Sequence, residues 1–187
     1  MKKTVITSLL YTAITAVFLG ILYPLGITAI ARVAFPYQAN GQLIRNSSGE
    51  IIGSRLIGQP FTGPQYFHSR PSAAGAGYDA TASSGSNLGP TSKALADRIQ
   101  QSGAAEGNNP VPIDLVTTSA SGLDPDITPA AALFQIPRIA DLRNLSEQQL
   151  RGLVDTHTTQ RKFGVLGEST VNVLELNLAL NNLKLSK

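Results

Sequence analysis

The longest apolar run of the chain lies at its N-terminus. Residues 5–31 contain no charged side chain, and 19 of these 27 residues are apolar. Because about 20 apolar residues suffice for an α-helix to cross a bilayer, this run predicts a transmembrane helix, which we place at residues 5–35. Pro24 lacks a backbone N–H, so we expect it to kink this helix or to loosen its last turn.

Small side chains recur at every fourth position of the predicted helix, at Ser8, Thr12, Ala16 and Gly20. Residues four apart lie on one face of an α-helix. In lipid, helices associate through close approach of their backbones across such small side chains. We therefore expect this face to pack against a second helix, although small residues are also common in membrane helices in general.

The segment after the span predicts short strands and loops. Residues 36–58 have the pattern of a connector leading into short strands, with a turn at residues 46–49. Residues 71–91 are dominated by Gly, Ala, Ser and Thr, which is typical of a flexible linker. Tyr78 and Leu88 could instead hold these residues as an ordered loop, and periodicity does not decide between the two alternatives.

Further along, the pattern predicts helices separated by loops. We expect a helix from near Thr91 to about Gln101, a loop over residues 103–112 and a short apolar segment at 113–116. Thr128 is a suitable N-cap for a helix that begins with Pro129. That helix should be disturbed at Pro137.

The last two elements are also predicted to be helices. Ser146 and Gln149 form a capping box, and the helix that they begin should end near Gly164. The leucines after Val173 fit both strand alternation and one helical face. Because Leu, Ala and Glu dominate this run and β-branched residues stop at Val173, we favour a helix.

The surplus positive charge of the chain flanks the apolar run. The net charge is +3, yet residues 36–187 contain 12 basic and 12 acidic side chains, so the surplus consists of Lys2, Lys3 and Arg32. This distribution removes the main support for nucleic-acid binding. The positive-inside rule then places the N-terminus in the cytoplasm.

These patterns together predict a single N-terminal transmembrane helix followed by one α+β extracytoplasmic domain. Residues 1–4 would be cytoplasmic, residues 5–35 would span the membrane, and residues 36–187 would form the outer domain. A cleaved secretory signal ending near Ala31 is the alternative, but 27 uncharged residues exceed the 7–15 of a typical signal core.

The chain offers few groups for catalysis. It contains no Cys, which excludes disulfides and thiolate chemistry, and only two His. Ser119 or Ser121 could be combined with His157 and an aspartate into a hydrolytic triad, but any Ser-rich chain allows such a combination. His157 is better explained as a helix-capping or core-edge residue. We therefore predict no catalytic residue.

Other candidate motifs are similarly weak. Residues 75–80 match G-x-G-x-x-A without a preceding apolar strand, so dinucleotide binding is not indicated. Asp124-Pro125-Asp126 offers too few oxygen ligands for a cation and is better explained as an Asx-type turn. We predict no metal site. Arg70 could face a partner or pair with a carboxylate of its own domain.

Several motifs along the chain resemble the family of KdpC, the C subunit of the potassium-transporting Kdp ATPase. The matching residues run from the membrane span to the C-terminus, and they are Gly53-Ser54, Leu56–Gln59, Phe61, Tyr66-Phe67, Arg70–Ala73, Gly85–Thr91, Pro112, Asp114–Thr117, Ser119–Pro125, Val171–Leu174 and Leu176-Asn177. Two positions depart from the family pattern, since Asp126 stands in place of a histidine and Pro137 in place of a small residue.

The resemblance implies a bacterial inner-membrane complex. In it a channel-like A subunit selects potassium, a P-type ATPase B subunit hydrolyses ATP, and a small F subunit and this C subunit assist. The family's C subunit is described as an assembly factor and as a catalytic chaperone that raises ATP affinity. We expect no cofactor to bind this chain directly, with ATP and potassium handled by the complex.

Within the matching motifs we select Arg70, Asn87 and Asp124 as candidates for the partner interface. The expected function is that of a docking subunit on the channel-like subunit. The alternatives are a membrane-anchored periplasmic hydrolase and a cleaved exported binding protein.

Overall fold

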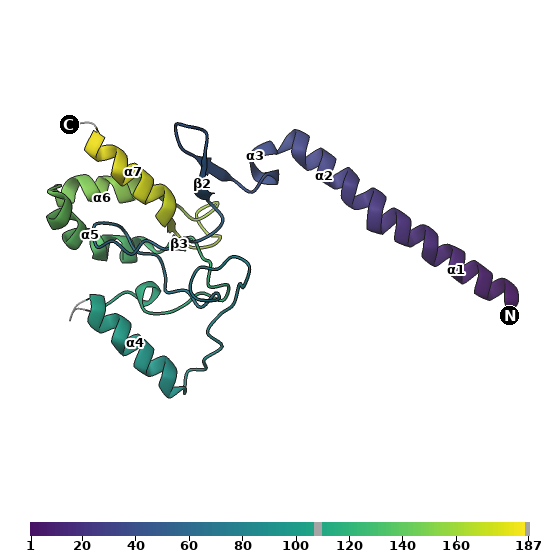
Figure 1. Cartoon of the computed structure of the whole chain (residues 1–187), viewed down its shortest axis with the longest axis horizontal. Coiled ribbons are helices and arrows are strands. Elements are labelled where there is room, and N and C mark those ends of the chain that lie inside the picture. Colours follow the sequence, from purple (N-terminus) through teal and green to yellow (C-terminus); the bar gives the residue numbers. More distant parts are fainter. Residues whose placement is uncertain (107–109, 186–187) are drawn as a thin grey trace. The chain divides into compact units, whose positions relative to one another are not determined.

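The computed structural model describes residues 1–106 and 110–185 and contains one apolar N-terminal helix followed by a domain of helices and small sheets (Figure 1). This arrangement confirms the predicted fold class of one span and an α+β domain. The chain divides into two compact units, Met1–Ser54 and Arg55–Lys187, and each unit is described by itself.

The first unit begins with a continuous helical stretch of 33 residues, Lys2–Ala34, which is long and apolar enough to cross a membrane. It consists of α1 (Lys2–Val17), a π-helical turn η1 (Phe18–Leu22) and α2 (Tyr23–Ala34). In the π turn the Tyr23 N–H bonds to the Phe18 carbonyl, five residues back. Pro24 therefore does loosen the helix, but in the preceding turn rather than the last one, because its ring and missing N–H disturb the bond to Gly20.

The rest of the first unit is a short helix and a hairpin. Helix α3 (Pro36–Ala39) is followed by the antiparallel strands β1 (Leu43–Arg45) and β2 (Ile51–Ser54). The Asn46 side chain closes the turn between them, because its Oδ1 accepts from the N–H groups of Ser48 at 3.0 Å and Glu50 at 2.9 Å. The predicted turn at residues 46–49 is confirmed.

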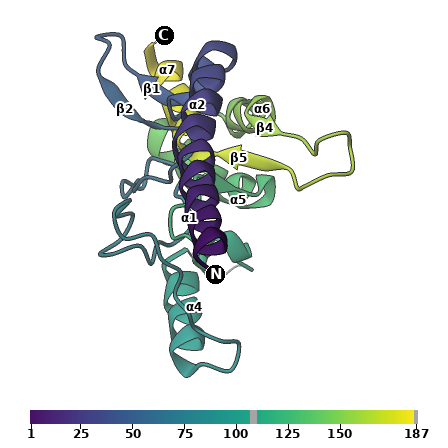
Figure 2. The ribbon, with the colours of Figure 1, turned by 90° about the vertical axis from the view of Figure 1, so that its right-hand side faces the viewer.

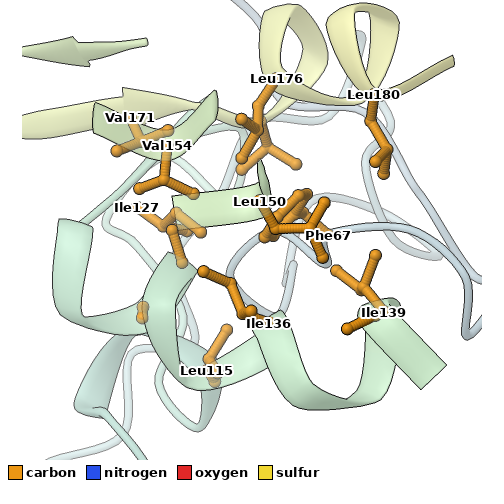
Figure 3. Packing of buried hydrophobic residues seen from close by; sticks show 14 residues of the cluster. Phe67, Leu115, Ile127, Ile136, Ile139, Leu150, Val154, Val171, Leu176 and Leu180 are labelled. Carbon is orange, nitrogen blue, oxygen red and sulfur yellow. The ribbon is translucent and has the colours of Figure 1, made fainter. Parts of the chain in front are cut away.

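The second unit packs three helices against a three-stranded antiparallel sheet of order β3-β5-β4. Its elements are α4 (Lys93–Glu106), the 3₁₀ turn η2 (Ile113–Leu115), β3 (Asp126–Ile127), α5 (Pro129–Arg143), α6 (Glu147–Thr156), β4 (Thr158–Thr159), β5 (Thr170–Asn172) and α7 (Val173–Leu185). Figure 3 shows the core between α5, α6, α7 and the sheet. Its fully buried large side chains include Phe67, Ile136, Ile139, Leu150, Val154, Val171, Leu176 and Leu180.

Local signals set the helix starts in this domain. Thr128 caps α5, since its Oγ1 accepts from the Ala131 N–H at 3.2 Å. Ser146 and Gln149 form the predicted capping box at the start of α6. The C-terminal run is a helix, as predicted, and it begins directly after β5.

Two predicted helix ends are wrong, and Pro137, where a disturbance was predicted, does not end its helix. Helix α5 continues through Pro137 to Arg143, because Pro137 lies on the exposed side while Ile136 and Ile139 on either side of it are fully buried. Helix α6 ends at Thr156 rather than near Gly164.

Helix α4 also departs from the prediction at its end. It continues past the expected end at Gln101 and through Gly103 to Glu106. The predicted loop over residues 103–112 therefore begins later, and its residues 107–109 lie outside the described part of the chain.

Residues 64–70, a turn followed by irregular backbone, run through the domain without a strand partner. Their backbone groups bond to side chains of α5 and α7 instead. Asn177, 1% exposed, accepts from the Phe67 N–H and donates to the Phe67 carbonyl, both at 2.9 Å. Gln135, also 1% exposed, accepts from the His68 N–H at 2.7 Å and donates to the His68 carbonyl at 3.2 Å.

Two arginines and a tyrosine also bond to this segment. Arg138 donates to the carbonyls of Pro64 and Tyr66. Arg143 Nε donates to the Gln65 carbonyl at 2.8 Å, and its guanidinium lies 4.7 Å from the centre of the Tyr66 ring. The Tyr78 hydroxyl donates to the Arg70 carbonyl at 2.5 Å. We call residues 64–70, with these bonds, the clamped segment.

The clamped segment should depend on the amide of Asn177. Replacing Asn177 with Ala leaves the buried N–H and carbonyl of Phe67 without partners, and each such group costs about 1–3 kcal/mol. We expect Asn177→Ala to lower the free energy of unfolding by about 2–5 kcal/mol, measured by urea denaturation of the full chain in detergent. Asn182→Ala, an exposed asparagine on the same helix, is the matched control and should change it by less than about 0.5 kcal/mol. Equal effects of the two variants would contradict the clamp.

Candidate functional site

Arg70 stands at the end of the clamped segment and pairs with Asp124. Arg70 Nη1 lies 3.2 Å from Asp124 Oδ2, and both side chains are partly exposed, 24% and 32%. Arg70 Nη2 also lies 3.5 Å from Thr117 Oγ1 and 3.4 Å from the Thr118 carbonyl. Two of the three predicted interface residues therefore meet, and the carboxylate partner of Arg70 belongs to its own domain.

The Gly- and Ser-rich residues 71–91 are an ordered loop and not a free linker. Ser72 Oγ donates to the Gly122 carbonyl at 2.6 Å and accepts from the Tyr78 N–H at 2.8 Å. The Ser84 N–H donates to the Ser121 carbonyl at 3.0 Å. This loop is therefore bonded to residues 117–125, and we call the two segments together the loop layer.

Close backbone contact explains why glycine is needed in the loop layer. Gly122 has φ +67°, and a Cβ there would lie 2.5 Å from the Ser84 carbonyl oxygen and 2.7 Å from the Ala74 nitrogen. A Cβ at Gly58 would lie 2.6 Å from the Asp124 carbonyl oxygen. Any larger side chain would separate these segments, so the glycines fix the approach of the chain to Asp124.

An open pocket of about 470 Å³ lies beside the Arg70–Asp124 pair. Its lining residues are Leu56, Arg70, Thr118, Ser119, Ala120, Ser121, Leu123, Asp124 and Pro125. The pocket thus combines an ion pair, hydroxyl groups and small apolar side chains on one face of the loop layer. Such a mixed, open surface suits contact with another macromolecule better than enclosure of a small ligand.

Asn87, in the loop layer, and Asp126, just after it, lie outside the Arg70–Asp124 pair. Asn87 is exposed and adopts φ +53°, a conformation in which asparagine is enriched. The Asp126 N–H donates to Asp124 Oδ1 at 3.1 Å, which confirms the Asx-type turn. Asp126 Oδ1 itself accepts from Asn172 Nδ2 at 2.9 Å. At the start of α5 the buried carboxylate of Asp114 accepts from the Thr128 N–H at 2.8 Å.

The residues considered for hydrolysis have structural surroundings. His157 is the C-cap of α6, and its Nδ1 lies 2.9 Å from the Leu153 carbonyl, which confirms its prediction as a capping histidine. Ser119 and Ser121 line the pocket beside Arg70, and no histidine is among the described residues that line it. The structure therefore does not bring the proposed triad together in this pocket.

A second polar group joins α4 to the clamped segment. His68 Nδ1 lies 3.5 Å from Glu106 Oε1, and His68 Nε2 lies 3.2 Å from the Gly63 carbonyl. The hydrogen bond from His68 lowers the pKa of Glu106, and the charges of His68 and Arg138 act in the same direction against its partial burial. Burial lowers the pKa of Arg138 in turn.

The small-residue face of the membrane helix is only partly regular. Ser8, Thr12 and Ala16 lie in α1, where residues four apart share a face. Gly20 lies in the π turn η1, in which each turn contains more residues. A Cβ at Gly20 would meet nothing within 4 Å in this chain, so the position is open to a neighbouring helix.

The residues that hold the clamped segment were missed by the sequence reasoning. Gln135, Arg138 and Arg143 fall within α5, and Asn177 lies in α7. A polar amide at a position where helical spacing predicts a buried side chain is the signal that could have revealed Gln135 and Asn177, because buried amides must find hydrogen-bond partners.

The chain is similar over nearly its whole length to known proteins. The family model described as "KdpC: K+-transporting ATPase, c chain" matches residues 5–182. A relative from Koribacter versatilis named potassium-transporting ATPase KdpC subunit is 60% identical over 185 residues, covering 97% of this chain and 95% of the relative. Relatives of the same name from Acidobacterium capsulatum and Caulobacter vibrioides are 59% and 54% identical, covering 95% and 88% of this chain and 97% and 86% of their own lengths.

The Glu106 contact should stabilise the domain in a pH-dependent way. Because the folded-state pKa of Glu106 is lowered, its contribution should be fully present above pH about 4.3, the ordinary value of a glutamate, and be lost as pH falls through the lower folded value. Glu106→Gln should reduce the free energy of unfolding by about 1 kcal/mol at neutral pH and by nothing in strong acid, measured by urea denaturation.

The control for this prediction is Asp97→Asn, which removes the exposed Lys93–Asp97 pair of the same helix and should have a smaller effect at neutral pH. A Glu106→Gln difference that persists unchanged in strong acid would contradict the assignment.

Proposed function

The chain belongs to the KdpC family of K⁺-transporting ATPase c chains, and from this premise we propose that it is a non-catalytic accessory subunit of an ATP-driven potassium uptake complex. The observation that carries the proposal is the family match over residues 5–182. Relatives at 54–60% identity cover the chain from its membrane helix to its last helix. Membership favours this function over the alternatives of an anchored hydrolase and a cleaved exported binding protein.

The proposed partners are the channel-like A subunit, the P-type ATPase B subunit and the small F subunit, together with the lipid bilayer. We place the chain in the bacterial inner membrane, with the N-terminus in the cytoplasm and the domain outside. The basic Lys2 and Lys3 before the span support this orientation. In this arrangement the subunit assembles and stabilises the complex by docking on the channel-like subunit.

Two surfaces are proposed for the docking. One is the small-residue face of the membrane helix, at Ser8, Thr12, Ala16 and Gly20. The other is the rim of the loop layer, where Arg70 and Asp124 line an open pocket and Asn87 is exposed. A partly exposed arginine paired with a carboxylate can also bond to a docking protein, because its guanidinium has more N–H donors than the carboxylate uses.

The family's role as a catalytic chaperone is proposed to act at a distance. A hydrocarbon core of about 30 Å would separate the outer domain from cytoplasmic ATP. Direct contact between this domain and the nucleotide is then excluded by the proposed topology. An effect on the ATP affinity of the B subunit would have to pass through contacts of the membrane helices.

Enlarging the small-residue face should weaken assembly. The double variant Thr12→Ile/Gly20→Ile adds bulk where a partner helix would approach, and nothing in this chain lies near Gly20 to clash with it. We expect reduced co-purification of the A, B and F subunits with the tagged variant. Ala13→Ile, about 100° around the helix from Thr12, makes a similar enlargement on another face and should leave recovery unchanged. Unchanged recovery of the double variant would count against the packing face.

The orientation can be tested with reporter fusions at the C-terminus. Alkaline phosphatase fused after Lys187 should be active, since that enzyme matures only outside the cytoplasm, and a cytoplasmic reporter at the same position should be inactive. Intact-mass measurement should find the N-terminal residues retained. The reverse pattern of reporter activity would overturn the topology, and a mature chain beginning near Arg32 would overturn the anchor.

A further inference from the structure

The segment between β4 and β5, residues 160–169, presents large apolar side chains to solvent. Phe163, Val165 and Leu166 are 91%, 74% and 59% exposed. Figure 2 shows this segment extending away from the helices of the domain. Single exposed apolar side chains are ordinary on protein surfaces, but three together at the tip of one hairpin indicate a contact site.

The tip of this hairpin is held by its own hydrogen bonds. The Lys162 N–H donates to the Leu166 carbonyl and the Leu166 N–H to the Lys162 carbonyl, both at 2.9 Å. Below the tip, Ser169 Oγ donates to Gln160 Oε1 at 3.0 Å. These bonds fix the backbone of the tip, which reduces the backbone entropy lost when the tip binds.

Phe163 occupies a position that its backbone does not favour. Its φ is +55°, in the left-handed region that bulky residues rarely adopt and that asparagine or glycine tolerate better. Because the Phe163 ring is 91% exposed, its burial within the domain does not offset the strain of this backbone conformation. The placement is understandable if the ring is covered by something outside the domain.

The charges beside the tip indicate what covers it. Arg161 and Lys162 are exposed next to the apolar residues, and Glu168 is the one acidic residue among residues 160–169. Apolar side chains flanked by basic ones match a phospholipid surface, where acyl chains lie beneath phosphate groups. The centre of a protein interface is by contrast depleted in lysine, so the composition favours lipid over a protein partner.

The N-terminal apolar helix would strengthen a weak lipid contact of the hairpin by keeping the domain near the bilayer. The domain follows an apolar helix, Lys2–Ala34, that is long enough to span a bilayer. Such a tether keeps the domain at a high effective concentration near the lipid surface, so a few inserted side chains suffice for stable contact. This reasoning is the same for either orientation of the domain.

We propose that the hairpin tip, Arg161–Leu166, is a second membrane contact of this chain. Phe163, Val165 and Leu166 insert into the interfacial region of the nearer leaflet, and Arg161 and Lys162 bind phosphate groups of anionic phospholipids. The domain is then held to the bilayer at two points, the spanning helix and the hairpin. The proposal goes beyond the proposed docking function and does not depend on it.

The absence of cysteine from the sequence allows a direct test on the full chain. Val165→Cys would carry an environment-sensitive fluorophore in nanodiscs of phosphatidylethanolamine and phosphatidylglycerol, with quencher-labelled lipids added. We expect a blue-shifted emission that the lipid quencher reduces. Ala94→Cys, exposed on α4, is the control, and its label should report water and escape quenching.

Further variants separate the two parts of the contact. In the Val165→Cys chain, Phe163→Asn removes the ring but suits the left-handed backbone, and it should abolish the blue shift. Arg161→Glu/Lys162→Glu should weaken the quenching, because each basic residue near an anionic surface strengthens association about fivefold. Nanodiscs of phosphatidylcholine alone should give weaker quenching than anionic ones.

Three results would overturn the proposal. A label at position 165 that reports water in every nanodisc would show that the tip is free. Equal quenching at positions 94 and 165 would show unspecific adsorption. Shielding of position 165 only after the other subunits are added would identify a protein as the occupant. The first two results come from the chain alone, so they are distinct from a failure of docking.

Discussion

The domain depends on hydrogen-bonding the backbone of one irregular segment, residues 64–70, that crosses its core without a neighbouring strand. A buried peptide group without a hydrogen bond costs about 1–3 kcal/mol, and the segment contains Phe67, which is fully buried. The chain meets this requirement with side chains. Two amides, Gln135 and Asn177, each bond both backbone groups of one residue, as a paired strand would. Two arginines of α5 and the Tyr78 hydroxyl supply further donors. Helices α5 and α7 are thereby joined through the segment as well as through apolar contact.

The position of the loop layer follows from this arrangement. Arg70 is the last residue of the clamped segment. The bonds to Phe67 and His68 therefore fix where the Arg70 guanidinium meets Asp124. The Gly- and Ser-rich loop then bonds to residues 117–125 with Gly122 at the closest approach. A surface with no regular secondary structure is held in one shape because each of its parts bonds to a fixed neighbour. Such a surface can contact a partner without first having to become ordered, which lowers the entropic cost of binding.

The sequence predicted what depends on local pattern and missed what depends on distant contacts. The span, the hairpin turn, the Thr128 cap and the capping box of α6 were all predicted, because each is set by residues within a few positions. The helix through Pro137 was not, because buried neighbours on both sides outweigh one lost hydrogen bond. Ordering of residues 71–91 could not be derived, since it rests on bonds to residues some 40 positions away, such as that between Ser84 and Ser121. The pairing of Arg70 with Asp124 was left open for the same reason.

Side-chain amides thus hold residues 64–70 as firmly as strand pairing would, and the loop layer is fixed through them. Residue-resolved hydrogen exchange on the full chain in lipid nanodiscs would measure this protection. We expect the N–H groups of Phe67 and His68 to exchange as slowly as those in the middle of α6, at a rate set by unfolding of the whole domain. Exchange of these two N–H groups at the rate of exposed loop residues, while α6 stays protected, would contradict it.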